Sequence, residues 1–383
     1  FLSSAYTGTI SQEANLTVTS AFTQEGTGTF ECLTPQTFTF TSESFSISDN
    51  RGRFLRFTGS GTSGSPYLIY DVFALQAMKQ YLNDTAINFK LNQNIDAAIT
   101  SHWNGGAGFE PVGNGSSSTQ YFKGKFYGNN KTISGLYINR PSTGNIGLFG
   151  YTFGSTIQDI GMVGGSLNGG SSVGGLVGIA DSSTISNSYA TGSVTGTGQL
   201  GGLVGYNTSS STISNSYATG NVTGTSQGLG GLVGVNTSSC TITNSYATGS
   251  VSGSGISSNY SGGLVGWNVT SSTISNSYAT GSVSGATYVG GLVGLVQDSS
   301  TISNSYATGN ATGSSQVGGL VGFVSTSTIT RNYYCGSPNN SLGTQVTPSQ
   351  LKNRSTFSNW DFKNTWLMDE NKNYPYHTWE AWN

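Results

Sequence analysis

The sequence predicts an all-β protein built around a right-handed parallel β-solenoid. One phrase, GLFG or GLVG, recurs seven times, with its leucines 28, 27, 29, 32, 28 and 28 residues apart. Glycine accounts for 57 of 383 residues and β-branched residues dominate the rest of each repeat, which disfavours helical repeats. The repeat is too short for a propeller blade of about 40 residues and fits one solenoid coil. Parallel crossover connections are right-handed almost without exception, which gives the hand.

Stacking of the coils explains why so few positions vary. Successive coils lie about 4.8 Å apart, so a residue repeated in each coil lies over its own copy. A second phrase, TISNSYATG or TITNSYATG, follows the same period. Three apolar columns are expected inside: Leu176, Leu203, Leu232, Leu264, Leu292 and Leu320; Ile185, Ile213, Ile242, Ile274, Ile302 and Ile329; and Val194, Val222, Val251 and Val283.

Repeated polar and aromatic residues should stack in the same way. A tyrosine column is expected from Tyr189 to Tyr306. An amide ladder, in which each side chain bonds to the next, is expected from Asn187, Asn215, Asn244, Asn276, Asn304 and Asn332.

Charge is scarce, and this follows from the architecture. Charged residues make up 8 % of the chain, and between residues 165 and 330 the only two are Asp181 and Asp298. Like charges stacked at strand spacing would repel each other. With a net charge of −2 and no basic patch, the chain is not expected to bind nucleic acid. No run of about 18 apolar residues occurs, so no transmembrane segment is expected.

The flanking regions divide the chain into four predicted parts. Alternating polar and apolar residues in TFTFT (37–41) and SFSIS (44–48) predict a small β-sandwich-like domain over residues 1–64, with a linker at 59–66. An opening segment follows at 65–121, then the solenoid at 122–334 and an aromatic-rich C-terminal cap at 335–383.

The opening segment contains the one helix that the pattern predicts, at residues 71–83. Asp71 can cap it, and Leu75, Met78 and Leu82 share one face. Because the end of a solenoid exposes unpaired strands, this helix is expected to close the first coil. The C-terminal aromatics leave two interpretations open, a packed cap or a platform for sugar stacking; they include Trp360, Trp366, Trp379 and Trp382.

The inventory of reactive residues predicts no catalytic, cofactor-binding or metal site. The two histidines, His102 and His377, lie in the flanking parts without motif context. Asp181 and Asp298 are four coils apart, about 19 Å by coil spacing, which is too far for a shared glycosidase site. The cysteines number three: Cys32, Cys240 and Cys335. They are either free and buried or include an interchain bridge.

The repeats also resemble a known family. GGLVG…TISNSYATGSVTG is similar to the GLUG motif of bacterial and archaeal surface proteins, and similarity continues in FKGKFYGNNKTISGLYI at 122–138, in residues 66–99 and in residues 355–379. The resemblance implies a secreted or cell-surface protein with an adhesive or structural role and no catalytic residues. Residues 1–64 lie outside it.

These observations predict a non-enzymatic extracellular protein, either adhesin-like or the subunit of a filament, sheath or surface layer. The expected partners are further copies, recruited through strand addition at the N-terminal segment, and cell-surface glycans. Two alternatives stay open. One is a carbohydrate- or ice-binding solenoid that uses the column Thr191, Thr219, Thr248, Thr280 and Thr308, and the other is a polysaccharide-active enzyme.

Three sequons are candidates for N-glycosylation because each falls just after the GLVG phrase, where a turn is expected. They begin at Asn207, Asn236 and Asn268.

Overall fold

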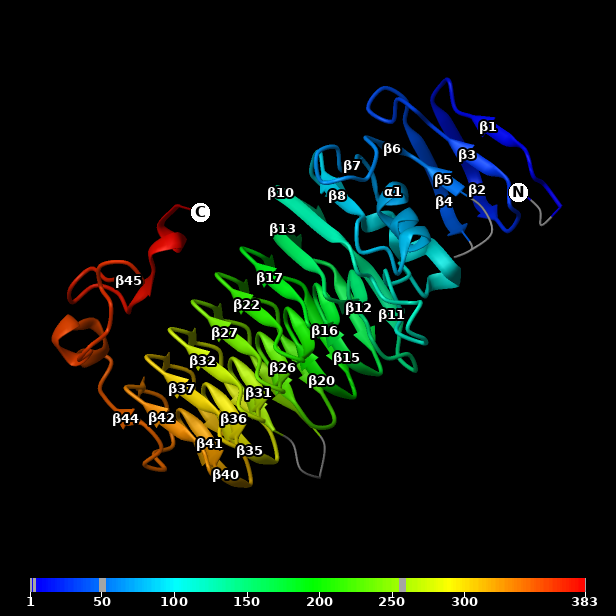
Figure 1. Ribbon diagram of the computed structural model, residues 1–383. Coiled ribbons are helices and arrows are strands. Elements are labelled where there is room, and N and C mark those ends of the chain that lie inside the picture. Colours follow the sequence, from blue (N-terminus) through cyan, green and yellow to red (C-terminus); the bar gives the residue numbers. More distant parts are fainter. Residues whose placement is uncertain (1, 3–4, 48–52, 255–259, 383) are drawn as a thin grey trace.

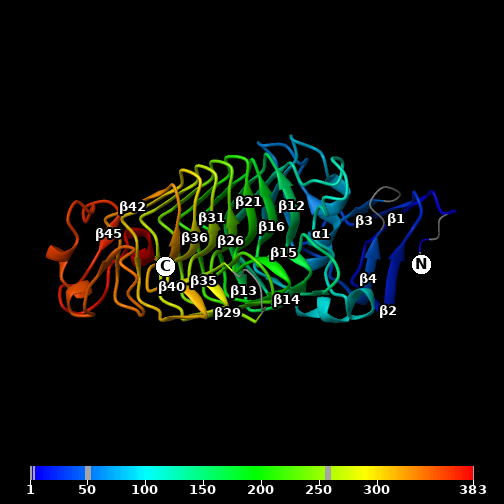
Figure 2. The same cartoon turned by 90° about the horizontal axis from the view of Figure 1, so that it is seen from below.

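The computed structural model describes residue 2 and residues 5–47, 53–254 and 260–382 as a rod of stacked coils (Figures 1 and 2). The described residues contain one α-helix, α1 (Val72–Ala77), and five short 3₁₀ segments. These are η1 (Met78–Tyr81), η2 (Ala98–Gly106), η3 (Gln350–Lys352), η4 (Arg354–Thr356) and η5 (Thr378–Trp382). The remaining elements are strands, which confirms the all-β solenoid.

Four sheets run along the rod, and a full coil contributes a strand or a strand pair to each of them. We call the first sheet the aromatic flank. It contains β6 (Phe57–Thr58), β7 (Tyr67–Ile69), β8 (Asn88–Leu91), β9 (Ile95–Asp96), β10 (Lys125–Ser134), β13 (Thr156–Val163), β17 (Thr184–Ser186), β18 (Tyr189–Ala190), β22 (Thr212–Ser214), β23 (Tyr217–Ala218), β27 (Thr241–Thr243), β28 (Tyr246–Ala247), β32 (Thr273–Ser275), β33 (Tyr278–Ala279), β37 (Thr301–Ser303), β38 (Tyr306–Ala307), β42 (Thr328–Thr330), β43 (Tyr333–Tyr334) and β44 (Thr344–Gln345).

The other three sheets complete each coil. The second contains β11 (Tyr137–Arg140), β14 (Ser166–Gly169), β19 (Ser193–Gly196), β24 (Val222–Gly224), β29 (Val251–Gly253), β34 (Val283–Ser284) and β39 (Ala311–Thr312). The third contains β12 (Phe149–Phe153), β16 (Val177–Asp181), β21 (Val204–Thr208), β26 (Val233–Asn236), β31 (Val265–Asn268), β36 (Val293–Val296) and β41 (Val321–Val324). The fourth contains β15 (Ser171–Gly174), β20 (Gly198–Gly201), β25 (Leu229–Gly230), β30 (Ser261–Gly262), β35 (Thr287–Gly290) and β40 (Ser315–Gly318). All pairings in the four sheets are parallel except that of β6 with β7.

The repeat period is one coil, as predicted. The backbone N–H of Leu203 donates to the carbonyl of Leu232 at 3.0 Å, so leucines of successive repeats are neighbours. The leucine and valine columns are buried, and so is the isoleucine column except at its last member, Ile329, which is partly buried. The hydrophobic effect therefore acts along one continuous core.

The paired glycines before each leucine are required by close packing. A β-carbon at Gly230 would lie 1.9 Å from the carbonyl oxygen of Val233, and one at Gly231 would lie 2.1 Å from that of Gly263. Neither distance is possible for real atoms, so only glycine allows this corner of the coil to pack against the next.

The N-terminal segment forms two small facing sheets, but its strands are all parallel. One sheet contains β1 (Thr9–Ser11), β3 (Thr29–Glu31) and β5 (Arg53–Leu55), and the other contains β2 (Leu16–Gln24) and β4 (Phe40–Ile47). The two layers of the expected sandwich are present. The chain alternates between them with parallel pairing, as in a short solenoid, and not with the antiparallel pairing of a sandwich. Alternation along a strand reports which face is buried and is silent on strand direction, so the sequence pattern left this open.

The N-terminal segment is also continuous with the main core. Phe45 lies 5.3 Å from Trp103 and Phe40 lies 4.8 Å from Phe73, measured between ring centroids. The linker expected at 59–66 is instead the turn of a hairpin, because β6 and β7 pair as antiparallel strands.

Helix α1 begins where predicted and is shorter than predicted. The Asp71 carboxylate accepts a hydrogen bond from the Ala74 N–H at 2.8 Å, as an N-cap does. The helix ends at Ala77 and continues as the 3₁₀ segment η1. All six of its residues are buried, because the N-terminal sheets cover it. The helix therefore joins two parts of the rod and does not close an open end (Figure 1).

The C-terminal region has two roles, of which only one is that of a cap. Strand β44 pairs with β43, and the Asn340 side chain donates to the carbonyl of Val321 at 2.8 Å, so residues 335–346 cover the last coil. The chain then turns back along the aromatic flank, including the hairpin of β45 (Trp366–Leu367) and β46 (Tyr376–His377) (Figure 1, red). We call residues 357–382 the C-terminal strap.

Candidate functional site: the aromatic flank

The tyrosines of successive coils form a continuous stack on the aromatic flank. Ring centroids are 4.7 Å apart between Tyr189 and Tyr217, 4.8 Å for the next two pairs and 4.9 Å between Tyr278 and Tyr306. Neighbouring ring planes differ by 4 to 8°. The coil spacing alone sets this geometry, which is why the predicted tyrosine column forms.

The C-terminal strap lies against this stack. Its Trp360, Trp366, His377 and Trp379 stack in sequence at 4.6 to 5.4 Å. Trp366 is fully buried and Trp360 is 7 % exposed. These residues therefore pack the strap onto the tyrosines. The side chain of Trp382 lies outside the described residues.

Hydrogen bonds fix the strap in register with the coils. The phenol of Tyr278 donates to the Glu380 carboxylate at 2.8 Å, and that of Tyr306 donates to the Pro375 carbonyl at 2.6 Å. The Trp379 indole donates to the backbone carbonyl of Asn244 at 3.2 Å. Desolvation, strengthened by neighbouring phenols and Glu380, raises the pKa of Tyr278 and Tyr306 well above the ordinary value of 10.0.

His377 is a structural residue of the strap. Its Nδ1 lies 2.8 Å from a Glu380 carboxylate oxygen and its Nε2 lies 2.8 Å from the Asn276 carbonyl. Both ring nitrogens are thus occupied, and the ring is fully buried. It therefore has no nitrogen with which to act as a base. The other histidine, His102, is exposed in η2.

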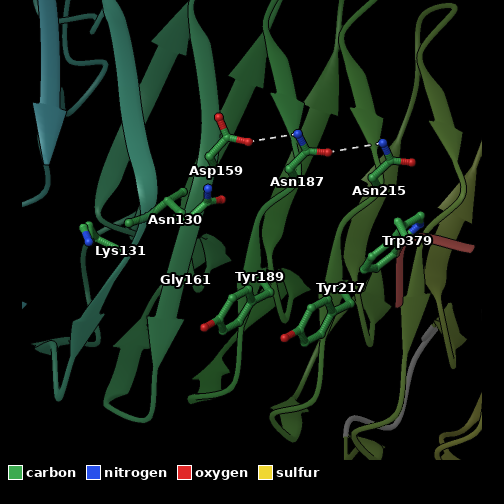
Figure 3. A pocket seen from close by; sticks show the side chains of 10 residues that line it. Asn130, Lys131, Asp159, Gly161, Asn187, Tyr189, Asn215, Tyr217 and Trp379 are labelled. Atoms are coloured by element: carbon green, nitrogen blue, oxygen red, sulfur yellow. Dashed lines mark hydrogen bonds between the residues drawn. The ribbon is translucent and has the colours of Figure 1, made fainter. Parts of the chain in front are cut away.

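Coverage by the strap stops short of the first ring. Tyr278 and Tyr306 are buried, whereas Tyr217 and Tyr189 are half-buried. Beyond Trp379 the flank is hollowed into a groove (Figure 3). We call it the flank groove, and its lining is Asn130, Lys131, Asp159, Ile160, Gly161, Asn187, Tyr189, Asn215, Tyr217 and Trp379.

An amide ladder forms one side of the flank groove. The Asn187 amide donates to Asp159 at 2.9 Å, and Asn215 donates to Asn187 at 3.2 Å (Figure 3). Asn244 in turn donates to Asn215 at 3.3 Å. Asp159 was not predicted as the first member. Aligning TIQDIGM at 156–162 beneath TISNSYA would have shown it, together with Gly161 in the place of the tyrosine.

The predicted ladder is shorter than expected and its last member is misplaced. Asn276 and Asn304 share the backbone conformation of the column, but among the described residues no side-chain bond joins them. The coil pairing of Tyr306 with Tyr333 puts Arg331 in the asparagine position. Asn332 falls instead in the adjacent serine column, where its side chain accepts from the Ser305 N–H at 2.9 Å. TITRNYY at 328–334 aligns beneath TISNSYA without a gap, so the sequence itself has arginine in the asparagine position of this coil.

A second amide ladder lies inside the rod, and it overturns the glycosylation prediction. Asn207, Asn236 and Asn268 are fully buried in β21, β26 and β31. Asn207 donates to Asn236 and Asn236 donates to Asn268, each at 2.8 Å. The residues after GLVG are therefore part of a strand and not of an exposed turn, and the folded protein offers none of these amides to a glycan.

Cys240 occupies a place in a column of serines. The N–H of Ser183 donates to the Ser211 hydroxyl at 2.8 Å, and that of Cys240 donates to the Ser272 hydroxyl at 3.2 Å. Burial raises the pKa of the Cys240 thiol to about 12. All three cysteines are free, with Cys32 also buried and Cys335 partly exposed.

The described residues contain no group of three or more histidines, cysteines or carboxylates that could hold a metal ion. None of the described helices has the length and apolar character needed to span a membrane.

Comparison with known proteins identifies the repeat. The GLUG motif matches residues 169–195, 196–223, 225–252, 257–284 and 285–312. These five coils are GLUG repeats. The chain is 35 % identical over 196 residues to halomucin of Haloquadratum walsbyi, and the match covers 47 % of this chain and 2 % of halomucin. It is 39 % identical over 93 residues to a protein of Evansella cellulosilytica named as a Gly-rich membrane protein, covering 24 % of this chain and 10 % of that protein. Both names are consistent with a GLUG-repeat surface protein.

A solved structure shares the fold. The crystal structure of a protein described as an immunoglobulin A1 protease from Bacteroides ovatus superposes with a TM-score of 0.53 and 18 % identity. The match covers 84 % of this chain and 94 % of that one. At 18 % identity the likeness to this structure concerns the fold alone. The matches to the two sequence relatives cover only 2 % of halomucin and 10 % of the Evansella protein.

Proposed function

We propose that this GLUG chain is a non-enzymatic extracellular surface protein with an adhesin-like role. The observation that supports it best is the combination of a rigid, nearly uncharged rod with GLUG repeats shared with halomucin. Continuous hydrogen-bonded columns along the coils suit a structural spacer. The described histidines, cysteines and carboxylates do not gather into a group that could hold a metal ion.

Two measurements test this proposal. Intact cells of the source organism are treated with a membrane-impermeant biotin reagent, and labelling of the GLUG chain is expected. Beads coated with the purified chain are expected to adhere to such cells, whereas beads coated with a chain of scrambled repeats are not. A chain that stays unlabelled until the cells are lysed contradicts the surface location, and equal adhesion of both bead types contradicts the adhesive role.

A second candidate function is self-association through the N-terminal sheets. Among the described residues, β1 pairs only with β3, which leaves its other edge with unpaired backbone groups, whereas the outer edge of β2 is bridged by Leu2 at Gln24. Neither β1 nor β2 contains a charged residue that would oppose pairing. The opposite end of the rod is covered by residues 335–346. The free N-terminal edge of one chain can then pair only with the same edge of a second chain. Such a contact gives a closed two-fold dimer in place of the filament expected from the sequence.

The oligomeric state tests the second candidate. Sedimentation of the full chain should show a concentration-dependent dimer, and deletion of residues 1–11, which removes β1, should shift it to the monomer. A monodisperse monomer at high concentration, or a dimer that survives the deletion, contradicts pairing through this edge.

A further inference from the structure

The flank groove has the chemistry of a carbohydrate site. We propose that it binds an uncharged oligosaccharide, with one pyranose ring against the exposed part of the Tyr189 ring and its hydroxyls on the ladder of Asp159, Asn187 and Asn215. This proposal deepens the adhesin-like role and rests on it only for biological meaning, because binding can be measured on the purified chain.

The first argument is the free hydrogen-bonding capacity of the amide ladder. A side-chain amide has two N–H donors and an oxygen with two lone pairs. Asn187 spends one donor on Asp159 and one lone pair on Asn215. One donor and one acceptor of this exposed side chain are left, and Asn215 repeats the arrangement one coil on. A hydroxyl group both donates and accepts, so neighbouring hydroxyls of a sugar complement each amide.

The second argument is the interrupted tyrosine stack. Tyr189 pairs in register with Gly161 of the preceding coil, where the column has no ring. A β-carbon at Gly161 would lie 2.3 Å from the Cζ of Tyr189, so the Tyr189 ring itself leans over this glycine and occupies the place of the missing side chain. The stack thus ends at a half-buried aromatic ring beside the ladder (Figure 3). The apolar face of a pyranose can stack on such a ring, since the ring is a flat apolar surface with a polar rim.

Residues of β10 and of the strap line the two ends of the groove. Trp379 of the strap lies at one end, and Asn130 and Lys131 lie at the other. These two belong to a bulge in β10, where the register with β13 shifts between Tyr127 and Lys131. Three coils lie between the two ends, so the site suits a short oligosaccharide rather than a single sugar.

Charge selects against acidic sugars. The Asp159 carboxylate lies at the head of the ladder, accepting from Asn187 and from Gln158 at 2.8 Å. The single cation of the groove, Lys131, lies at its end. A uronic acid over the ladder would face this carboxylate, whereas neutral hydroxyls would donate to its remaining lone pairs.

Two measurements on the full chain test the proposal. A glycan array is screened first. Calorimetry then measures the affinity for four soluble probes: cellohexaose, chitohexaose, mannohexaose and oligogalacturonate. At least one neutral probe should bind, and Tyr189→Ala should weaken it about tenfold, as expected for loss of one stacking partner. Asn187→Ala should weaken the same probe. Tyr206→Ala is the matched control, because Tyr206 is a half-buried tyrosine in β21 of another sheet.

Three results overturn the proposal: no binding of any neutral glycan on the array, unchanged affinity of Tyr189→Ala, or a preference for oligogalacturonate. Thermal melting of each variant separates lost binding from lost folding. A chain that labels at the cell surface but binds no glycan refutes this site and leaves the proposed function standing. A chain that binds a glycan but stays unlabelled on intact cells supports this site and contradicts the proposed surface location.

Discussion

Two columns of asparagine run through the same coils, and they differ in nearly everything except their period. The inner ladder of Asn207, Asn236 and Asn268 is fully buried, with amide bonds of 2.8 Å. The outer ladder around Asn215 is partly exposed, with bonds of 3.2 and 3.3 Å. A repeated residue therefore predicts that its copies stack. Its position within the coil decides whether the stack is buried in the core or exposed on the surface.

The backbone explains the outer column. Asn187, Asn215 and Asn244 have φ angles of 50, 48 and 49°. Asparagine enters this left-handed region more readily than any residue except glycine. It turns the chain between paired strands such as β17 and β18, and the amide bonds follow from that turn. The inner asparagines lie within strands, where only their side-chain bonds explain them.

The largest effect is expected from breaking the inner ladder at its centre. Asn236→Leu leaves the Nδ2 of Asn207 without an acceptor and the Oδ1 of Asn268 without a donor, both in the dry interior. Each orphaned group costs about 1–3 kcal/mol, so the free energy of unfolding should fall by about 4 kcal/mol. Urea unfolding measures it.

A triple variant provides the control for that result. Replacing Asn207, Asn236 and Asn268 together with valine removes donors and acceptors at once, and the next two coils already have Val296 and Val324 in this column. The triple variant should be more stable than Asn236→Leu. If the single variant unfolds at the wild-type urea concentration, the inner ladder contributes nothing.

The next effect is a loss of stability at alkaline pH, which belongs to the flank. In the unfolded chain tyrosines ionise near pH 10.0, whereas burial keeps Tyr278 and Tyr306 neutral in the folded state. Above pH 10 the unfolded state therefore binds fewer protons, and stability falls as pH rises. Each such group contributes about 1.4 kcal/mol per pH unit to the slope. Burial raises the pKa of Tyr81, Tyr151 and Tyr246 as well, so these tyrosines add to the slope.

Urea unfolding between pH 9 and 11.5 measures this slope. Tyr278→Phe removes one of the ionisable groups and should lower the slope by about 1.4 kcal/mol per pH unit, despite losing the bond to Glu380. A slope that is unchanged in the variant would mean that the flank opens before the rod unfolds.

Much of this architecture could be predicted because stacking converts a period into contacts. The Leu, Ile and Val columns, the tyrosine stack and the Asp71 cap were all accessible from the sequence. The parallel pairing of the N-terminal strands was not, since alternation looks the same in both directions. Nor was the strap, because its tryptophans contact tyrosines of distant repeats, as Trp379 does with Tyr217.

The groove was missed for a different reason. Asp159 and Gly161 are departures from the repeat, and a motif directs attention to what is repeated. The inner asparagines were assigned to the wrong face because glycine-rich phrases suggest turns, whereas GLVG leads directly into β21, β26 and β31.

A smaller change in the free energy of unfolding is expected from substitutions in the outer ladder. Two variants separate the contribution of the amide hydrogen bond from that of the left-handed backbone conformation. Asn244→Gly removes the bond to Asn215 and keeps the φ of 49° favourable, so stability should change by only about 0.5 kcal/mol. Asn244→Leu forces a branched side chain into the left-handed region and should cost about 1–2 kcal/mol. Equal losses in both variants would show that the amide bond is the dominant contribution.

The smallest effect is expected at Cys240, where the interior departs from its own pattern. The residue occupies a column in which neighbouring coils have Ser211 and Ser272, and its N–H donates to the Ser272 hydroxyl at 3.2 Å. Cys240→Ser restores the hydroxyl series in a site shaped for it, so the free energy of unfolding should change by at most about 0.5 kcal/mol. Because burial raises the pKa of the thiol to about 12, the folded chain should also resist alkylation by iodoacetamide at pH 8.5. Mass spectrometry of the folded and the urea-unfolded chain compares the two states. Rapid labelling of Cys240 in the folded chain would mean that the coils separate at this column, and it would contradict the closed interior on which the contrast between the two ladders depends.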